Sequence, residues 1–167
     1  SMYSGFEESL QETYSVIALG HSPAEVLFVI VVIAITPGIC EELLFRGVLL
    51  HSFQRKMGVP ASIALSSMIF AAFHLNPVTF LPLSILGALF GYIVLRSGSV
   101  VPAILAHIIN NTIGIISLYL IDKSGILDSG PGAGTETSIL AVASILSLLI
   151  FLMLFTAFVA STRTRSL

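Results

Sequence analysis

The chain has few charged residues for its length. Only 10% of its 167 residues are Asp, Glu, Lys or Arg, whereas 56% are hydrophobic. Soluble domains carry roughly 25% charged residues, and about 45–50% apolar residues even when glycine is counted. The composition therefore excludes an ordinary water-soluble domain, and it predicts a polytopic membrane protein of one domain's length.

The chain also lacks cysteine pairs and basic runs. Its single cysteine, Cys40, excludes an internal disulfide and a multi-cysteine metal site, and we expect it to be a small buried hydrophobe. No Lys and Arg cluster is interleaved with aromatic residues, so nothing indicates a nucleic-acid partner. The first twenty residues are acidic and polar rather than basic and then apolar, so we expect no signal peptide there.

Apolar runs separated by turn residues predict an all-α, polytopic transmembrane helical bundle. It would have about five to six membrane helices and an N-terminal amphipathic helix in residues 1–22, where apolar residues recur about every fourth position. The helical core would cover residues 23–121, a glycine-rich loop 122–137, and a final transmembrane helix 138–162. Within the core, the expected helices are Ala24–Thr36, about 37–57, Ala61–Leu75, Phe80–Leu95 and Val100–Ile121.

Proline and glycine positions predict helix boundaries and contacts in this core. Ser22-Pro23 is expected to be an N-cap followed by the first helical residue. Pro37-Gly38 interrupts the next apolar run, so either the helix breaks there or Pro37 begins the following helix. Interrupted helices at membrane depth line protein or a cavity. Gly87 and Gly91, four residues apart, are expected to allow close helix packing.

Few polar side chains fall inside the predicted spans, and helical spacing sorts them. Glu42 and Arg46 are four residues apart, so they share a helix face and can pair, whereas Glu41 lies about 100° away around the helix. Ionisable residues at membrane depth are costly and usually mark a functional site. The complete set is Glu41, Glu42, Arg46, His51, His74, His107, Asn110 and Asn111.

A rise of about 1.5 Å per residue places Glu41, His74, His107 and Asn111 at similar depths in their helices. A carboxylate in such a layer suits a general base, and a nearby imidazole can hold the same water molecule. A second imidazole and a carboxamide can donate hydrogen bonds to an oxyanion. The four side chains therefore suit the addition of water to an amide carbonyl. A covalent acyl-enzyme is less favoured, because no serine or cysteine stands in a recognised motif with a histidine.

Other interpretations stay open at this point. The Glu42–Arg46 pair can be purely structural, and an intramembrane histidine such as His51 often only bonds to a neighbouring helix. A small transporter would use the carboxylates as a proton relay, but the chain shows no repeated pair of broken helices. The polar cluster would also suit a membrane scaffold without enzymatic activity.

Three motifs follow one another along the chain: Glu41-Glu42-Leu-Leu-Phe-Arg46, Phe70-Ala-Ala-Phe-His74 and His107-Ile-Ile-Asn-Asn111. In this order they resemble the CAAX prenyl protease and bacteriocin-processing family of intramembrane glutamate endopeptidases, which includes the Ras-converting enzyme. Each motif alone is a weak signal, whereas the ordered triple is a strong one. The resemblance covers about residues 37–112, roughly half of the chain.

The resemblance implies a role for each matching residue. Glu41 would be the base that activates water, and His74 would assist it. The pair Glu42–Arg46 would support the geometry of the site. His107 and Asn111 would form the oxyanion site.

The resemblance also implies an activity, the hydrolysis of a peptide bond near the C-terminus of a prenylated, CAAX-type or apolar peptide. The partners would be that peptide or lipidated protein and membrane lipid, in a prokaryotic cell membrane or a eukaryotic endoplasmic reticulum membrane. Some relatives are scaffolds or bacteriocin-immunity proteins, which is the alternative function. Two histidines and a glutamate can bind zinc, but no His-Glu-x-x-His sequence occurs, so we expect no metal and no cofactor.

Overall fold

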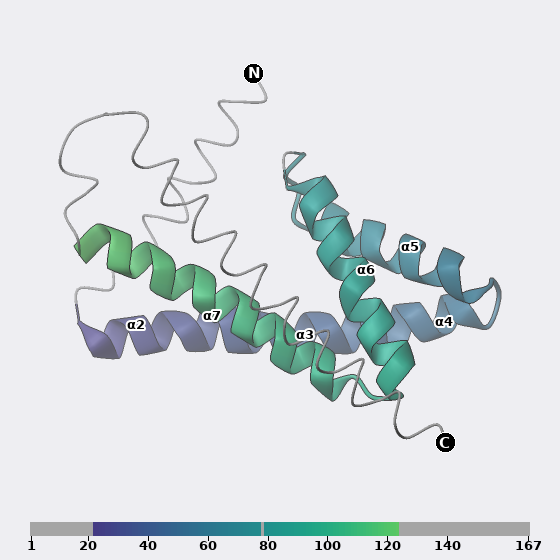
Figure 1. Cartoon of the computed structure of the whole chain (residues 1–167), viewed down its shortest axis with the longest axis horizontal. Helices are drawn as coiled ribbons and strands as arrows, with labels where there is room; N and C mark the ends of the chain where they lie inside the picture. Colours follow the sequence, from purple (N-terminus) through teal and green to yellow (C-terminus); the bar gives the residue numbers. More distant parts are fainter. Residues whose placement is uncertain (1–21, 78, 124–167) are drawn as a thin grey trace. The chain divides into compact units, whose positions relative to one another are not determined.

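The computed structural model describes residues 22–77 and 79–123, and every element in these residues is a helix (Figure 1). The all-α prediction is therefore confirmed for this part of the chain. The described residues belong to two compact units, each treated separately below: residues 35–108, and residues 22–34 with 109–123. The predicted amphipathic helix (apart from Ser22), the glycine-rich loop and the final transmembrane helix lie outside the described residues.

The first helical stretch runs without interruption from Pro23 to Gln54. The predicted N-cap is confirmed, because Ser22 Oγ accepts a hydrogen bond from the Glu25 N–H and the Glu25 carboxylate accepts one from the Ser22 N–H. Two of the stretch's segments, η1 and η2, are π-helical. In chain order the segments are α2 (Pro23–Val29), η1 (Ile30–Ile35), α3 (Thr36–Glu42), η2 (Leu43–Leu50) and α4 (His51–Gln54).

The predicted interruption at Pro37-Gly38 is wrong. Ile35, directly before α3, has helical dihedral angles (φ -71°, ψ -50°), and the helix continues through the proline. A proline removes one backbone N–H and crowds the turn before it. The π-helical turns of η1 lie at that turn, so a local change in the helical hydrogen-bond pattern accompanies the proline in place of a break.

In the unit of residues 35–108, α5 (Val59–Phe73) packs against α6 (Phe80–Ser97), as Figure 1 shows. The contact is close because small residues meet there. Gly87 and Gly91 of α6 are buried, and a Cβ atom added at Gly87 would lie 3.1 Å from Ser67 Cβ. The expected role of the two glycines in helix packing is confirmed, and both helices lie within two residues of their predicted bounds.

The turn after α5 begins with the residue that follows His74 in the sequence. His74 is the C-cap residue of that helix. Leu75 follows with φ 52°, a left-handed conformation that is uncommon for a residue other than glycine. Its N–H donates to the Ala72 carbonyl and closes the helix end. Helix α5 therefore ends at His74.

The other unit contains α2, residues 30–34 of η1, and residues 109–123 of α7 (Val101–Lys123). Val29, Ala34 and Ile115 are buried together in its apolar core. Ile115 of α7 packs there with residues at the end of α2 and in η1. The contact pairs the first helical stretch with a helix that begins more than seventy residues later.

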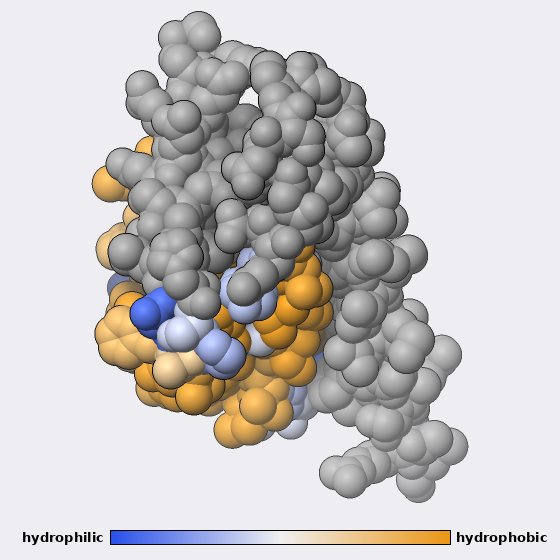
Figure 2. Space-filling model, turned by 90° about the vertical axis from the view of Figure 1, so that its left-hand side faces the viewer, coloured by the Kyte–Doolittle hydropathy of each residue, from blue (hydrophilic) through white to orange (hydrophobic). Residues whose placement is uncertain are grey.

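The surface of the described helices is that expected of a membrane protein. Two helices, Pro23–Gln54 and Phe80–Ser97, are long and apolar enough to cross a membrane, and Val59–Phe73 and Val101–Ser117 are shorter apolar helices. Phe28 is 69% exposed, and the coloured residues in Figure 2 present a mostly apolar (orange) surface. The total of five to six membrane helices stays a prediction.

Candidate active site

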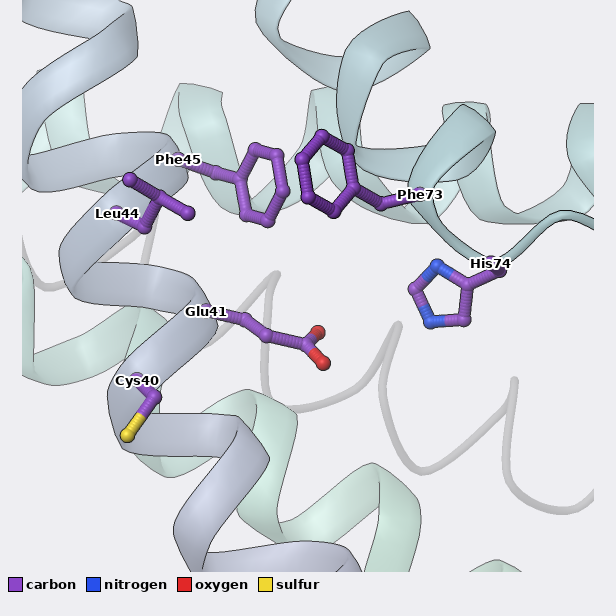
Figure 3. Close-up of a pocket in the computed structure, with 6 residues that line it drawn as sticks. All are labelled: Cys40, Glu41, Leu44, Phe45, Phe73 and His74. Carbon is purple, nitrogen blue, oxygen red and sulfur yellow. The ribbon is translucent and has the colours of Figure 1, made fainter.

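A cavity of about 220 Å³ brings together residues from two of the three motifs. Figure 3 shows the carboxylate of Glu41 and the imidazole of His74 pointing toward one another from facing elements. The rings of Phe45 and Phe73 lie edge to face, with centroids 5.4 Å apart, and form an apolar wall beside them. The cavity is lined by Cys40, Glu41, Leu44, Phe45, Phe73 and His74.

Glu41 lies in the last turn of α3. Its side chain lines the cavity, and one of its carboxylate oxygens is buried in the protein. Its side chain is 31% exposed, so water can reach the carboxylate. Its Oε2 atom is buried, lies 3.9 Å from His107 Nε2, and has no hydrogen-bond partner among the described residues. A water molecule in the cavity would therefore approach the carboxylate from the side of its other oxygen, Oε1.

His74 is oriented by its own helix. Its Nδ1 atom lies 3.1 Å from the Phe70 carbonyl oxygen, and a carbonyl oxygen can only accept a hydrogen bond. Nδ1 therefore carries the proton in the neutral ring, which leaves Nε2 as an acceptor. The edge of the ring also packs against Phe70, with centroids 5.0 Å apart.

Glu42 and Arg46 form a buried ion pair, as their spacing predicts. Both side chains are 0% exposed, and Arg46 NH1 donates to Glu42 Oε1 over 2.8 Å. Arg46 NH2 donates to the Gly87 carbonyl oxygen on α6 over 3.0 Å. The guanidinium lies 4.4 Å from the ring centroid of Phe70, an arrangement that stabilises a buried cation. The pair thus connects η2 to α5 and α6.

His107 joins this pair from α7. Its Nδ1 atom lies 2.9 Å from Glu42 Oε1, the same oxygen that Arg46 contacts. The imidazole stacks on Phe90 with an interplanar angle of 25° and a centroid separation of 5.3 Å. The ring is therefore held both in its plane and along one edge, and its Nε2 atom is directed toward Glu41.

Asn111, one helical turn after His107, belongs to the other unit. Its Nδ2 atom donates to the Ile33 carbonyl oxygen over 3.3 Å, and its Oδ1 atom accepts from Asn110 over 3.4 Å. This hydrogen bond connects α7 to η1 within that unit. Its oxyanion role stays a prediction.

Three residues differ from expectation or received no role from the sequence. Cys40 is exposed rather than buried, so that prediction is wrong; it lies where the surface of α3 meets the cavity. Nδ1 of His51 bonds to the Arg46 carbonyl over 2.7 Å, which is a structural contact. The Gly87 carbonyl, which accepts a hydrogen bond from Arg46, belongs to the backbone and is missed when only polar side chains are considered. The sequence indicated only that Gly87 belongs to a pair of small residues four positions apart.

The described residues show no group of three or more His, Cys, Asp or Glu side chains arranged to hold a metal ion. Hydrolysis without a metal nevertheless stays a prediction of the sequence. The chemistry that the observed side chains can supply is a carboxylate base, two oriented imidazoles and a buried cation.

A family model described as type II CAAX prenyl endopeptidase, Rce1-like, matches residues 23–113, just over half of the chain. The match includes all six residues predicted for the site. No curated protein and no solved structure gives a match.

Proposed function

Because this chain belongs to the Rce1-like family of type II CAAX prenyl endopeptidases, we propose that it is an intramembrane endopeptidase whose Glu41 and His74 activate water. The substrate would be a prenylated CAAX-type peptide or another apolar peptide, cleaved near its C-terminus. The family is membrane-embedded, and the two candidate spans agree with that location.

One observation carries the proposal: Glu41 and His74, from separate helices, line the same cavity. The Glu41 side chain is 31% exposed, so its carboxylate can accept from water, and His74 has Nε2 as an acceptor because Nδ1 is held by the Phe70 carbonyl. A water molecule placed between two such acceptors would donate both protons to them. Its oxygen lone pairs would then be directed away from both acceptors, toward a carbonyl carbon.

The proposed reaction begins when the Glu41 carboxylate takes a proton from water as its oxygen attacks the scissile carbonyl carbon. The carbonyl oxygen becomes an oxyanion, and the family resemblance assigns its stabilisation to His107 and Asn111. When the tetrahedral intermediate collapses, the C–N bond breaks and the leaving nitrogen receives the proton. The base regains its charge, so one water molecule is consumed and no cofactor is needed.

The cavity walls support an apolar substrate. Leu44, Phe45 and Phe73 supply hydrocarbon surface next to the two polar groups, and burial of apolar substrate surface there is favourable by about 25 cal/mol per Å². A charged peptide would lose its hydration on such walls without gaining a partner. We therefore place an aliphatic or lipid-bearing part of the substrate against them.

The test is cleavage of a farnesylated peptide by the purified chain in lipid vesicles, with mass analysis of the product. We expect the last three residues to be released, and Glu41→Gln to lower the rate by about 10²-fold or more. The matched control is Glu25→Gln, since glutamine also serves in a capping box. Full activity in Glu41→Gln would overturn the role of Glu41, and a wild-type chain that binds but never cleaves would favour the scaffold alternative.

A further inference from the structure

The buried carboxylate of Glu42 determines the tautomer of His107. Glu42 Oε1 lies 2.9 Å from His107 Nδ1 and 2.8 Å from Arg46 NH1. A guanidinium always donates, so its contact favours an ionised Glu42, and an ionised carboxylate only accepts hydrogen bonds. His107 must therefore present an N–H at Nδ1.

The position of Glu42 is itself fixed from several sides. Arg46 is held by the Gly87 carbonyl oxygen and by the ring of Phe70, so its NH1 cannot follow a moving carboxylate. Glu42 Oε2 is buried and has no hydrogen-bond partner among the described residues. Both donors are thus concentrated on Oε1, which makes this single oxygen the acceptor that orients the imidazole.

The opposite ring nitrogen of His107 then faces the proposed base. Nε2 lies 3.9 Å from Glu41 Oε2, and the stacking on Phe90 prevents the ring from turning away. With the proton on Nδ1, Nε2 of the neutral ring carries a lone pair and cannot donate to an oxyanion. It can donate only after it has received a proton.

We infer that Glu42 is a positioning residue, which holds His107 as the Nδ1–H tautomer so that Nε2 can take a proton from Glu41 during the reaction. The proton leaves water for the Glu41 carboxylate and passes from the side of Oε2 to His107 Nε2. The resulting imidazolium is paired with Glu42 and donates Nε2–H to the oxyanion. When the C–N bond breaks, that proton goes to the leaving nitrogen, and both side chains return to their starting states.

The arrangement gives the two adjacent glutamates different roles: one exchanges a proton, and the other stabilises the charged imidazole. The charged groups around the imidazole are Glu41 and Glu42 of α3 and Arg46 of η2, whereas α5 and α6 present the rings of Phe70 and Phe90. Glu41 exchanges a proton, and Glu42 stays charged and stabilises the imidazolium. The kinetic effect of this division rests on the proposed function. The assignment of the His107 tautomer does not.

The tautomer is tested on the full chain by ¹⁵N NMR of histidine-labelled protein, with His107→Gln used to assign one of its four histidines. Long-range ¹H–¹⁵N couplings distinguish the two neutral forms of imidazole. We expect His107 to carry its proton on Nδ1. A neutral ring protonated only on Nε2 would overturn the inference, whether or not the chain is a peptidase.

The positioning role is tested by a double-mutant cycle. Glu42→Gln should lower kcat by about 10²-fold with KM within about twofold, but it should change kcat by less than about twofold when introduced into His107→Gln. An equal loss in both backgrounds would show that Glu42 acts only as structural support. Ser66→Ala, a buried change on α5, is the control, with kcat near that of the wild type.

Discussion

Glu41 and Glu42 are neighbours in the sequence but occupy different environments: the Glu41 side chain is 31% exposed, whereas that of Glu42 is 0% exposed and bonded to Arg46. The helical rotation of about 100° between them accounts for the difference. One carboxylate faces a cavity that water can enter. The other completes a buried charge cluster, so substitutions at the two positions should have different effects on stability.

Breaking the buried pair should destabilise the fold far more than altering the exposed carboxylate. Arg46→Met removes the partner of Glu42 and should lower the free energy of unfolding by about 3–5 kcal/mol. Glu41→Gln should change it by less than about 0.5 kcal/mol. Denaturant titration in mild detergent measures both, and equal losses would contradict the division of roles.

Gly38 should resist substitution because helix α7 lies against it. A Cβ atom at this position would lie 2.6 Å from Ile108 Cγ1 and 3.3 Å from the Ile108 backbone nitrogen. Gly38→Ala should therefore cost about 1–3 kcal/mol. Gly47→Ala on the same helical stretch is the control, since its nearest neighbour would be 4.0 Å away. Ile108→Ala should recover part of the loss at Gly38, and no recovery would indicate another cause.

Phe73 should limit the size of the substrate group that enters the cavity. Its ring is 68% exposed and touches Phe45 at the cavity wall, so its removal widens the cavity at little cost in stability. Phe73→Ala should raise kcat/KM for peptides with bulky aromatic groups relative to small aliphatic ones by about 10-fold. The equally exposed Phe28, on α2, is the control: Phe28→Ala should leave the ratio unchanged. An unchanged ratio in Phe73→Ala would place the substrate elsewhere.

Asn111 should stabilise the unit that contains α2. Its carboxamide donates to the Ile33 carbonyl oxygen over 3.3 Å and so connects α7 to η1. Asn111→Ala should therefore cost about 1–3 kcal/mol of stability, measured by denaturant titration in mild detergent. An unchanged free energy of unfolding would show that this hydrogen bond does not contribute to the fold.

The motif residues and their helix faces were predictable from spacing alone. Glu42 and Arg46 pair because four residues make about one helical turn, and Gly87 packs closely because it has no side chain. The continuity of the helix through Pro37 was not predictable, since it depends on π-helical turns that leave no clear sequence pattern.

Contacts between residues far apart in the chain could not be predicted from the sequence either. His107 bonds to Glu42 across 65 positions, and a shared depth in the bundle does not say which of two adjacent carboxylates an imidazole meets. The Gly87 carbonyl that holds Arg46 belongs to the backbone, and every residue has such a group. Both contacts follow from how the helices pack, which local spacing does not determine.

The exposed Cys40 at the cavity wall gives the chain a built-in attachment point. Because it is the one cysteine in the sequence, a thiol-reactive spin label or fluorophore would attach at a single position without any substitution. In Figure 3 the Cys40 sulfur points away from the Glu41 carboxylate, so the label would extend from the outer side of α3 and leave the space between Glu41 and His74 free. A label placed there would report substrate entry as a change in its mobility or emission.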